Sequence, residues 1–157
     1  MGLIAKTPSR FTSAVKLVCD GGCRGNPGPG AIAGFILDNS NNELHRYSSC
    51  IGQTTNNRAE YHSLIKGLDA CAKFTRGEVT CFLDSEVVVK QMIGEFRLRS
   101  NELRALFHET KQLESAFRKV VYQHVKRTHP LMKKADRMVN EAFEGRFAQS
   151  PNNSLKA

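Results

Sequence analysis

Four acidic residues stand at positions where carboxylates are chemically useful. Asp20 and Asp84 each close a strand-like run, and Glu60 and Asp136 lie near the start of helix-like segments, beside the apolar stripe. Each alone has an ordinary role, because an aspartate before Gly-Gly suits a turn and an acid in the first helical turn suits the helix dipole. Four clustered carboxylates would repel one another unless a cation lay among them. Magnesium is the natural occupant, and two such ions about 4 Å apart are a known arrangement for splitting a phosphodiester.

The hydrophobic pattern predicts the elements that would bring these acids together. Residues 15–20 alternate between two faces, whereas Tyr61, Leu64 and Leu68 recur at helical spacing. Turn residues separate the first three strand-like runs, which indicates an antiparallel meander. Strands are expected at 15–20, 31–39, 43–52, 78–85 and 119–125, and helices at 58–74, 86–94, 101–117 and 133–145. The order β-β-β-α-β-α-α-β-α predicts an α/β fold, with one mixed sheet and helices packed on it.

Asp20 and Asp84 would share one edge of that sheet if their strands are parallel neighbours. Side chains alternate along a strand, so Asp20 points to the same side as Val18 and Asp84 to the same side as Phe82. Both carboxylates would then emerge at one edge and on one face. Helices that begin near Glu60 and Asp136 could direct the other two carboxylates to the same place.

Length and charge limit the class of protein and its partners. The chain has 157 residues, which suits one domain with its own core. Its formal net charge of +8 favours a polyanionic partner, most simply nucleic acid. The sequence contains neither an apolar run of roughly 20 residues, as a membrane helix needs, nor the shorter apolar core of a signal peptide. We expect a flexible arm at 1–14, one domain at 15–146 and a disordered tail at 147–157.

The five cysteines show no disulfide spacing. Because no secretion signal is recognisable, we expect free thiols in a reducing compartment, the cytoplasm. Cys19 with Cys23, and His124 with His129, leave a structural zinc site as an alternative. A buried thiol is the commoner outcome for Cys19, which lies in an alternating strand pattern.

Four separated motifs each carry one of the acids: CDGGCRGNPGPGAIAG, TTNNRAEY, LDSEVVVKQMIGEF and KKADRMVNEA. In this order they resemble the type 1 ribonuclease H family, over roughly Val15 to Phe143. The resemblance implies a ribonuclease H-like fold, a five-stranded mixed sheet flanked by helices on both faces, with the first and fourth strands as parallel neighbours. It also implies that 15–146 is a metal-dependent endoribonuclease domain. Such a domain hydrolyses the RNA strand of RNA–DNA hybrids by a two-metal-ion mechanism and leaves 5′-phosphate and 3′-hydroxyl ends.

The resemblance assigns the site as well. Asp20, Glu60, Asp84 and Asp136 would be the catalytic residues and the ligands of two Mg²⁺ ions. Mn²⁺ is a possible substitute, no other small-molecule cofactor is expected, and the protein would act as a monomer without membrane contact. The expected substrate-binding residues are Gly21, Gly22, Cys23, Asn26, Thr55, Asn56, Asn57, Arg58 and Glu86. The small residues after Asp20 would let the backbone approach the minor groove of the hybrid, where 2′-hydroxyls distinguish RNA from DNA.

Three features depart from the family pattern. Lys126 occupies the usual place of the catalytic-loop histidine, ten residues before Asp136. We therefore expect His129, in the same loop, to handle protons near neutral pH, while His124 fits the strand. Glu86 stands where a glutamine is familiar, and the segment before residue 101 lacks the longer basic protrusion of many relatives. The alternatives are a non-catalytic module of this fold that binds nucleic acid or protein, and a nuclease of this fold with another nucleic-acid substrate.

Overall fold

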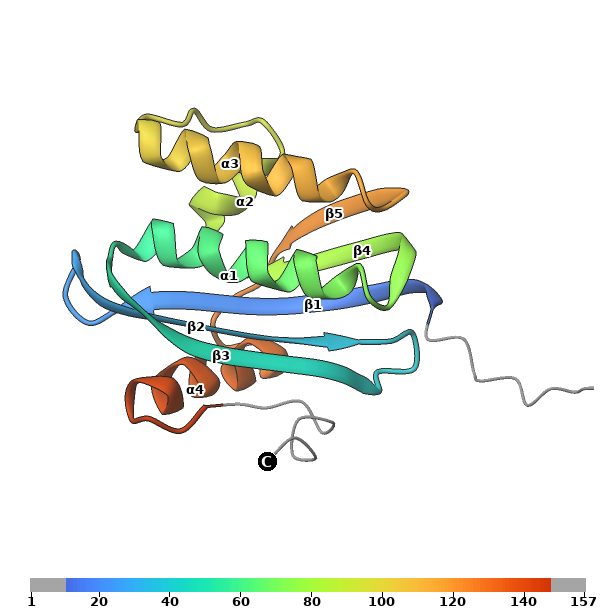
Figure 1. Cartoon of the computed structure of the whole chain (residues 1–157), viewed down its shortest axis with the longest axis horizontal. Coiled ribbons are helices and arrows are strands. Elements are labelled where there is room, and N and C mark those ends of the chain that lie inside the picture. Colours follow the sequence, from blue (N-terminus) through green and yellow to red (C-terminus); the bar gives the residue numbers. More distant parts are fainter. Residues whose placement is uncertain (1–10, 148–157) are drawn as a thin grey trace, which may run out of the picture.

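Five strands form one mixed sheet in the computed structural model, which describes residues 11–147 (Figure 1). The strand order is β3-β2-β1-β4-β5, so β1 is central. The strands are β1 (Thr12–Cys23), β2 (Gly28–Leu37), β3 (Glu43–Thr54), β4 (Thr75–Leu83) and β5 (Lys119–His124). The helices are α1 (Asn56–Cys71), α2 (Glu86–Met92), α3 (Asn101–Glu114) and α4 (Pro130–Phe143). The element order and the mixed sheet confirm the expected α/β fold.

Strand pairing places two of the four acids side by side. β1, β2 and β3 form the expected antiparallel meander, whereas β1 pairs parallel with β4 and β4 pairs parallel with β5. The last parallel pair between β1 and β4 is Val18 with Phe82. Asp20 and Asp84 each lie two residues further along these neighbouring strands. The carboxyl ends of the parallel strands therefore bring the two acids to one edge, as the sequence predicted.

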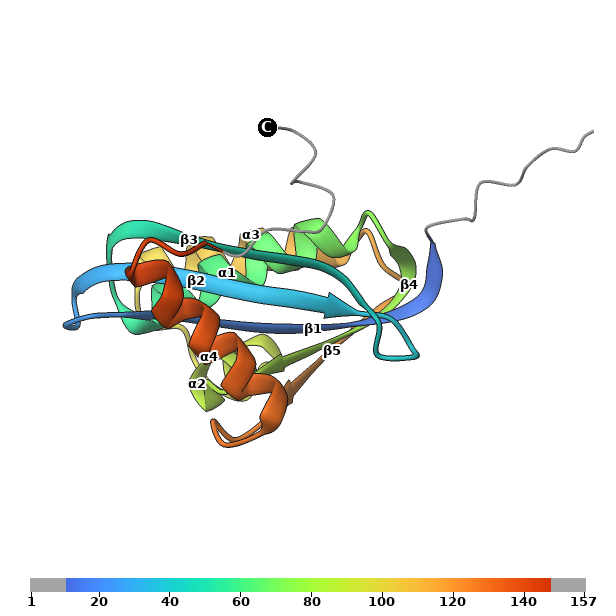
Figure 2. The same cartoon turned by 90° about the horizontal axis from the view of Figure 1, so that it is seen from below.

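Helices cover both faces of the sheet. Figures 1 and 2 show α1, α2 and α3 on one face and α4 alone across the other. Alternation along β1 divides its side chains between two apolar cores. Leu17 belongs to the larger core with the α1 helix, while Val18 packs in the smaller core with Met132 and Val139 of α4. Asp20 follows the alternation of Val18, so its side chain emerges on the side of α4.

β1 is longer at both ends than predicted. It begins at Thr12, so residues 12–14, which we assigned to the flexible arm, belong to the sheet. It also continues to Cys23, because Gly21 and Gly22 pair with β2. Asp20 therefore lies inside a strand and not at its end. The remaining arm residues, 1–10, and the tail residues 148–157 lie outside the described residues.

Two helices begin earlier than predicted because the residue before each one caps it. The Thr55 side chain accepts a hydrogen bond from the Arg58 amide, so α1 begins at residue 56 and not at 58. His129 caps α4, and Pro130 suits the first helical position because the amide it lacks would have no partner there. α4 consequently begins three residues before the predicted start at 133.

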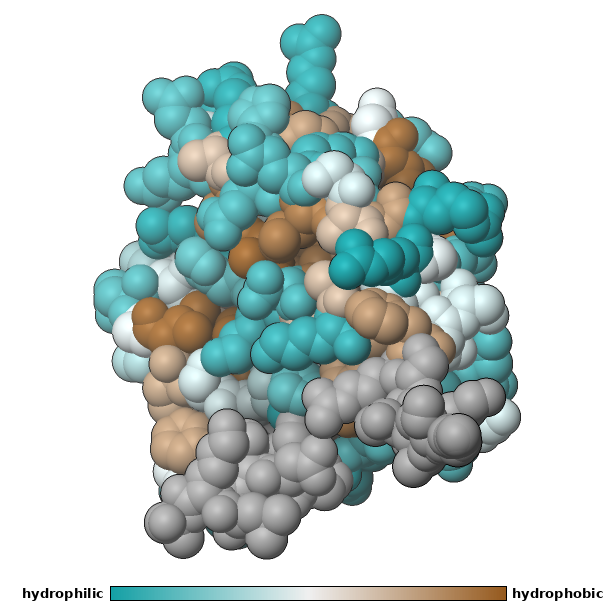
Figure 3. All heavy atoms as spheres, turned by 45° about the vertical axis from the view of Figure 1, so that its right-hand side comes forward, coloured by the Kyte–Doolittle hydropathy of each residue, from teal (hydrophilic) through white to brown (hydrophobic). Residues whose placement is uncertain are grey.

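The surface is dominated by polar side chains on the face drawn in Figure 3, where the apolar areas are separated from one another. The large apolar side chains that are exposed within residues 11–147 are Phe11, Val87, Ile93, Phe96 and Phe147. None of the helices that the structure describes combines the length and the apolar character needed to cross a membrane.

Candidate active site

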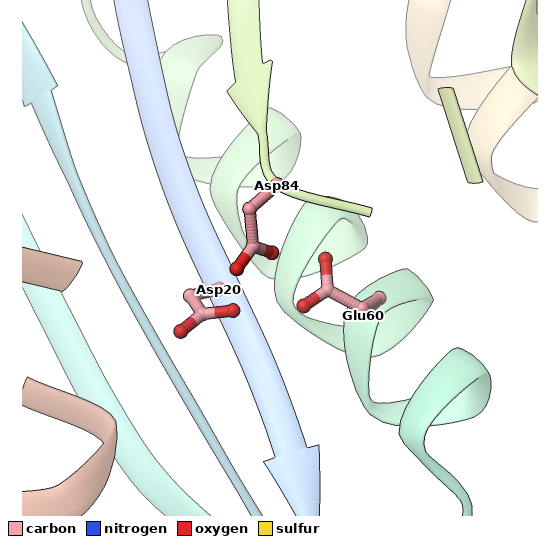
Figure 4. Close-up of side chains that lie close together, drawn as sticks. All are labelled: Asp20, Glu60 and Asp84. Atoms are coloured by element: carbon pink, nitrogen blue, oxygen red, sulfur yellow. The ribbon is translucent and has the colours of Figure 1, made fainter. Parts of the chain in front are cut away.

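Three carboxylates converge where β1, α1 and the end of β4 meet. Asp20 lies on β1, Glu60 on α1, and Asp84 directly after β4. One carboxylate oxygen from each lies within 4.8 Å of the others, and Figure 4 shows the three groups turned toward one another. Asp20 and Glu60 are buried, with only 2% and 5% of their surface exposed. Such a set of hard oxygen donors is typical of a divalent cation site.

Gly21 allows α1 to lie close enough to β1 for this meeting. A Cβ atom at Gly21 would lie 2.4 Å from the carbonyl oxygen of Ala59, the residue before Glu60. The backbone amide of Gly21 also donates a 3.0 Å hydrogen bond to Oε1 of Glu60, which fixes that carboxylate against the strand. We expected this glycine to let the backbone approach nucleic acid, and it lines the cavity described below. Its missing side chain is also required by packing inside the protein.

Two buried oxygen atoms of the site lack a partner within the described residues: Oδ1 of Asp20 and Oε2 of Glu60. Burial, together with the charges of Asp84 and Asp136, raises the pKa of Asp20 from its ordinary value to about 7, although its hydrogen bond with Glu60 acts in the opposite direction. Burial and the neighbouring Asp20 raise the pKa of Glu60 well above its ordinary range. Without a bound cation, the two carboxylates together therefore retain a proton near neutral pH. A bound cation would replace that proton. The residues present fit a divalent metal ion.

Asp84 and Asp136, in contrast, already have partners on the protein. Oδ2 of Asp84 accepts a 3.1 Å hydrogen bond from Nε of Arg127, and these two groups form an ion pair. The Nε2 atom of His124 lies 3.2 Å from the backbone oxygen of Asp84. On α4, Oδ2 of Asp136 accepts a 3.5 Å hydrogen bond from the side-chain Nδ2 of Asn140.

All four acids that the sequence indicated line a cavity of about 570 Å³. Asp136 lines it, although Asp136 lies outside the group of three that converge within 4.8 Å. The expected substrate-binding residues on its wall are Gly21, Gly22, Cys23, Asn56 and Asn57. The cavity thus brings the acidic cluster together with the glycine-rich segment and the start of α1.

Asn26 joins the glycine-rich segment to α1. Its Oδ1 accepts a 3.0 Å hydrogen bond from the Asn56 amide, and Oδ1 of Asn56 accepts a 3.1 Å bond from the Cys23 amide. The Cys23 thiol also lies 3.2 Å from the same Asn56 oxygen. These bonds engage the oxygens of both asparagines and orient the side chains. Their Nδ2 groups are donors, and neither has an acceptor among residues 11–147.

Four of the expected site residues are engaged elsewhere. Thr55 caps α1, and Arg58 forms an ion pair with Glu102 at 2.8 Å. Glu86 is exposed on α2, beside Lys90 at 3.5 Å, and is not among the residues that line the cavity. His129 does not line it either, because its Nδ1 accepts a hydrogen bond from the Leu131 amide as the cap of α4.

Sequence reasoning missed several residues on the cavity wall. Arg127 follows β5, whose carboxyl end lies at the same sheet edge as Asp84, so the order of the parallel strands was a usable signal. Arg24 and Phe143 also line the cavity, and the guanidinium carbon of Arg24 lies 4.4 Å from the centroid of the Phe143 ring. Nothing in the sequence pattern pairs those two residues, which are 119 positions apart.

Comparison with known proteins agrees with this geometry. Residues 18–142 match the family model described as reverse transcriptase-like. The bifunctional protein Rv2228c of Mycobacterium tuberculosis is 36% identical over 131 residues, which is 83% of this chain and 35% of that protein. The chain thus spans only about a third of that curated relative. It spans 62% of ribonuclease HI from Halobacterium salinarum, at 33% identity over 125 residues, or 80% of this chain.

Two solved structures resemble this chain over nearly their whole length. RNase H1 from the halophilic archaeon Halobacterium salinarum superposes with a TM-score of 0.79 at 32% identity, covering 84% of this chain and 98% of that one. LC11-RNase H1, solved in complex with an RNA/DNA hybrid, gives a TM-score of 0.78 at 35% identity, covering 83% and 97%. With its matching fold, acidic cluster and family model, this chain belongs to the type 1 ribonuclease H family.

Proposed function

We propose that this protein hydrolyses the RNA strand of RNA–DNA hybrids in a divalent-metal-dependent reaction that leaves 5′-phosphate and 3′-hydroxyl ends. The observation that carries the proposal is the convergence of Asp20, Glu60 and Asp84, with two buried carboxylate oxygens unpartnered, in a cavity open to a substrate. Family membership supports the activity, and the hybrid bound to LC11-RNase H1 supports the substrate.

The acids would hold two Mg²⁺ ions, with Mn²⁺ as a substitute. Asp20, Glu60 and Asp84 form the cluster, and Asp136 borders it from α4. When bound, such ions stabilise the charge that develops on the attacking and leaving oxygens of a phosphodiester. The protein's own part is positional. The Gly21 amide fixes the Glu60 carboxylate, and Arg127 fixes that of Asp84, so the donors are already oriented before substrate arrives.

Asparagine side chains would recognise the RNA strand. The Nδ2 groups of Asn26 and Asn56 are neutral donors whose positions are fixed by the bonds of their oxygens, and Asn57 lines the cavity beside them. A 2′-hydroxyl can accept from such a donor, and the shallow minor groove of an A-like duplex exposes it. DNA lacks that acceptor, so duplex DNA would leave the donors unpaired.

We also propose that the protein acts as a monomer in the cytoplasm. All five cysteines are free thiols, which supports a reducing compartment. The cavity is built from elements of one chain, so no second copy is needed to complete the acidic cluster.

Cleavage of a substrate panel tests the proposal. Labelled RNA–DNA hybrid, duplex RNA, duplex DNA and single strands are incubated with Mg²⁺, Mn²⁺ or EDTA, and the product ends are mapped. We expect metal-dependent cleavage of the RNA in the hybrid alone. Hybrid binding without cleavage would favour the non-catalytic module of this fold, and cleavage of DNA would favour a nuclease with another substrate.

A further inference from the structure

The helix α4 presents one face to the cavity from its acidic end to its far end. Asp136, Asn140 and Phe143 all line the cavity, at a spacing of four and then three residues. Residues seven apart lie on the same helix face, so Phe143 sits about 10 Å along α4 from Asp136, at 1.5 Å per residue. The cavity is therefore a trough along α4, with the acidic cluster at one end.

Arg24 occupies the other end of this trough. Its backbone amide donates a 2.9 Å bond to the Pro29 oxygen, which fixes the residue just after β1. Its guanidinium carbon lies 4.4 Å from the centre of the Phe143 ring, in the range of a cation–π contact. The side chain is exposed, and no carboxylate of residues 11–147 forms an ion pair with it. Its N–H groups are likewise without an acceptor in the part of the chain that the structure describes.

We propose that Arg24, held over the Phe143 ring, binds a backbone phosphate of the RNA strand next to the scissile one. The inference rests on the proposed function, which places the scissile phosphate of the RNA at the acidic cluster. A strand whose phosphate lies there and which continues along α4 meets Arg24 about 10 Å away. Guanidinium N–H groups match phosphate oxygens in a bidentate geometry, and a ring beneath the guanidinium leaves those N–H groups free.

This subsite lies too far from the reacting phosphate to act in the chemical step. Arg24 is thus a positioning residue, whose loss should raise KM while kcat stays near that of the parent protein. The Arg24→Ala variant should bind hybrid roughly 10-fold more weakly, and the slope of log affinity against log salt should fall by about one unit. Arg24→Lys keeps the charge but loses the bidentate geometry, so it should recover part of the affinity.

The chain offers a matched control in Arg76. Its guanidinium carbon lies 5.3 Å from the centre of the Phe11 ring, but Arg76 does not line the cavity. Arg76→Ala should leave the salt slope unchanged. Phe143→Leu keeps an apolar side chain but removes the ring. It should weaken binding about 2- to 5-fold, and should have no further effect when Arg24 is already alanine.

The decisive experiment pairs Arg24 with single phosphates. Hybrids carry one uncharged methylphosphonate linkage, moved stepwise along the RNA strand and then along the DNA strand. Affinities are measured with the non-cleaving Asp84→Asn background, with and without Arg24→Ala. We expect a single effective position, an RNA-strand linkage next to the scissile one. A methylphosphonate there should weaken hybrid binding when Arg24 is present, and should have no effect in Arg24→Ala.

Each result separates the two proposals. A parent protein that neither binds nor cleaves hybrid would overturn the proposed function, and this subsite with it. A parent that cleaves hybrid, combined with no coupling of Arg24 to any linkage, would reject the subsite alone. Coupling to a linkage of the DNA strand would also reject it, because the trough would then carry the wrong strand. If Arg24→Ala and Arg76→Ala weaken hybrid binding equally, the contact of Arg24 with the Phe143 ring is only structural, and the subsite is rejected.

Discussion

The acidic site contains two pairs of carboxylates in opposite situations. The inner pair, Asp20 and Glu60, is buried, and one oxygen of each lacks a partner within residues 11–147. The outer pair, Asp84 and Asp136, is held by Arg127 and Asn140. The same chemical group is therefore buried with an unpartnered oxygen in one place, and is paired with a protein side chain in the other. A metal ion bound at the proposed site would therefore relieve the inner pair, and would compete with Arg127 and Asn140 for the outer one.

The largest expected effect follows from Asp20→Asn. Removing a ligand at the centre of the cluster should lower hybrid cleavage by at least about 10³-fold, or roughly 4 kcal/mol. In EDTA above about pH 7, the same variant should melt higher than the parent, by roughly 5–10 °C, because the unfavourable buried charge of Asp20 is gone. Calorimetry and a hybrid cleavage assay measure the two changes.

Asp84→Asn is the comparison variant for the outer pair. It should lose cleavage as well, but its gain in melting temperature should be smaller, since the change leaves Arg127 without its carboxylate. Equal stabilisation by the two substitutions would remove the distinction between the pairs.

A pH dependence of stability should accompany the inner pair. The folded pKa of Asp20 is raised to about 7, so between about pH 4 and 7 the native state holds a proton that the unfolded chain has lost. The free energy of unfolding of the metal-free parent should therefore fall as pH rises through that window, by up to about 1.4 kcal/mol per pH unit for one proton. Asp20→Asn should show a flatter profile. Parallel profiles of the two proteins would mean that Asp20 ionises normally.

Arg127→Ala tests the competition at the outer pair. Removing a positive charge 3.1 Å from Asp84 should let the site bind cations more tightly, roughly 3- to 10-fold by Coulomb attraction. The Mg²⁺ concentration for half-maximal binding, followed by calorimetry, should fall accordingly. Lys126→Ala is the control, because Lys126 is an exposed neighbour in the same loop. A similar fall in both variants would indicate a general charge effect and no specific competition.

The smallest change in stability is expected at His129. Loss of the α4 cap in His129→Ala should cost about 1 kcal/mol of stability, or roughly 2–4 °C in Tm. His129→Asn restores a good cap without an imidazole, and so separates the two roles of the residue. If His129 also handles protons, as the sequence led us to predict, kcat should fall roughly 10²-fold in both variants. Normal turnover in His129→Asn would leave only the cap.

The sequence was most informative where a local rule fixes a position in space. Asp20 and Asp84 were predicted to meet because residues at the carboxyl ends of parallel strands share an edge, and they do. The packing constraint on Gly21 was not foreseen, since it comes from Ala59, 38 positions away. The partner of Arg24 was equally hidden. Long-range contacts between irregular segments and helix faces leave no periodic signal in the chain.

The strand order also determines when during synthesis the site can exist. β1 is made early, but its parallel partner β4 follows some fifty residues later, and the last acid of the cavity lies on α4, at position 136. Domains fold as units once their contacts are available, and non-local pairing is slow. A nascent chain therefore holds no complete acidic cavity until α4 has left the ribosome.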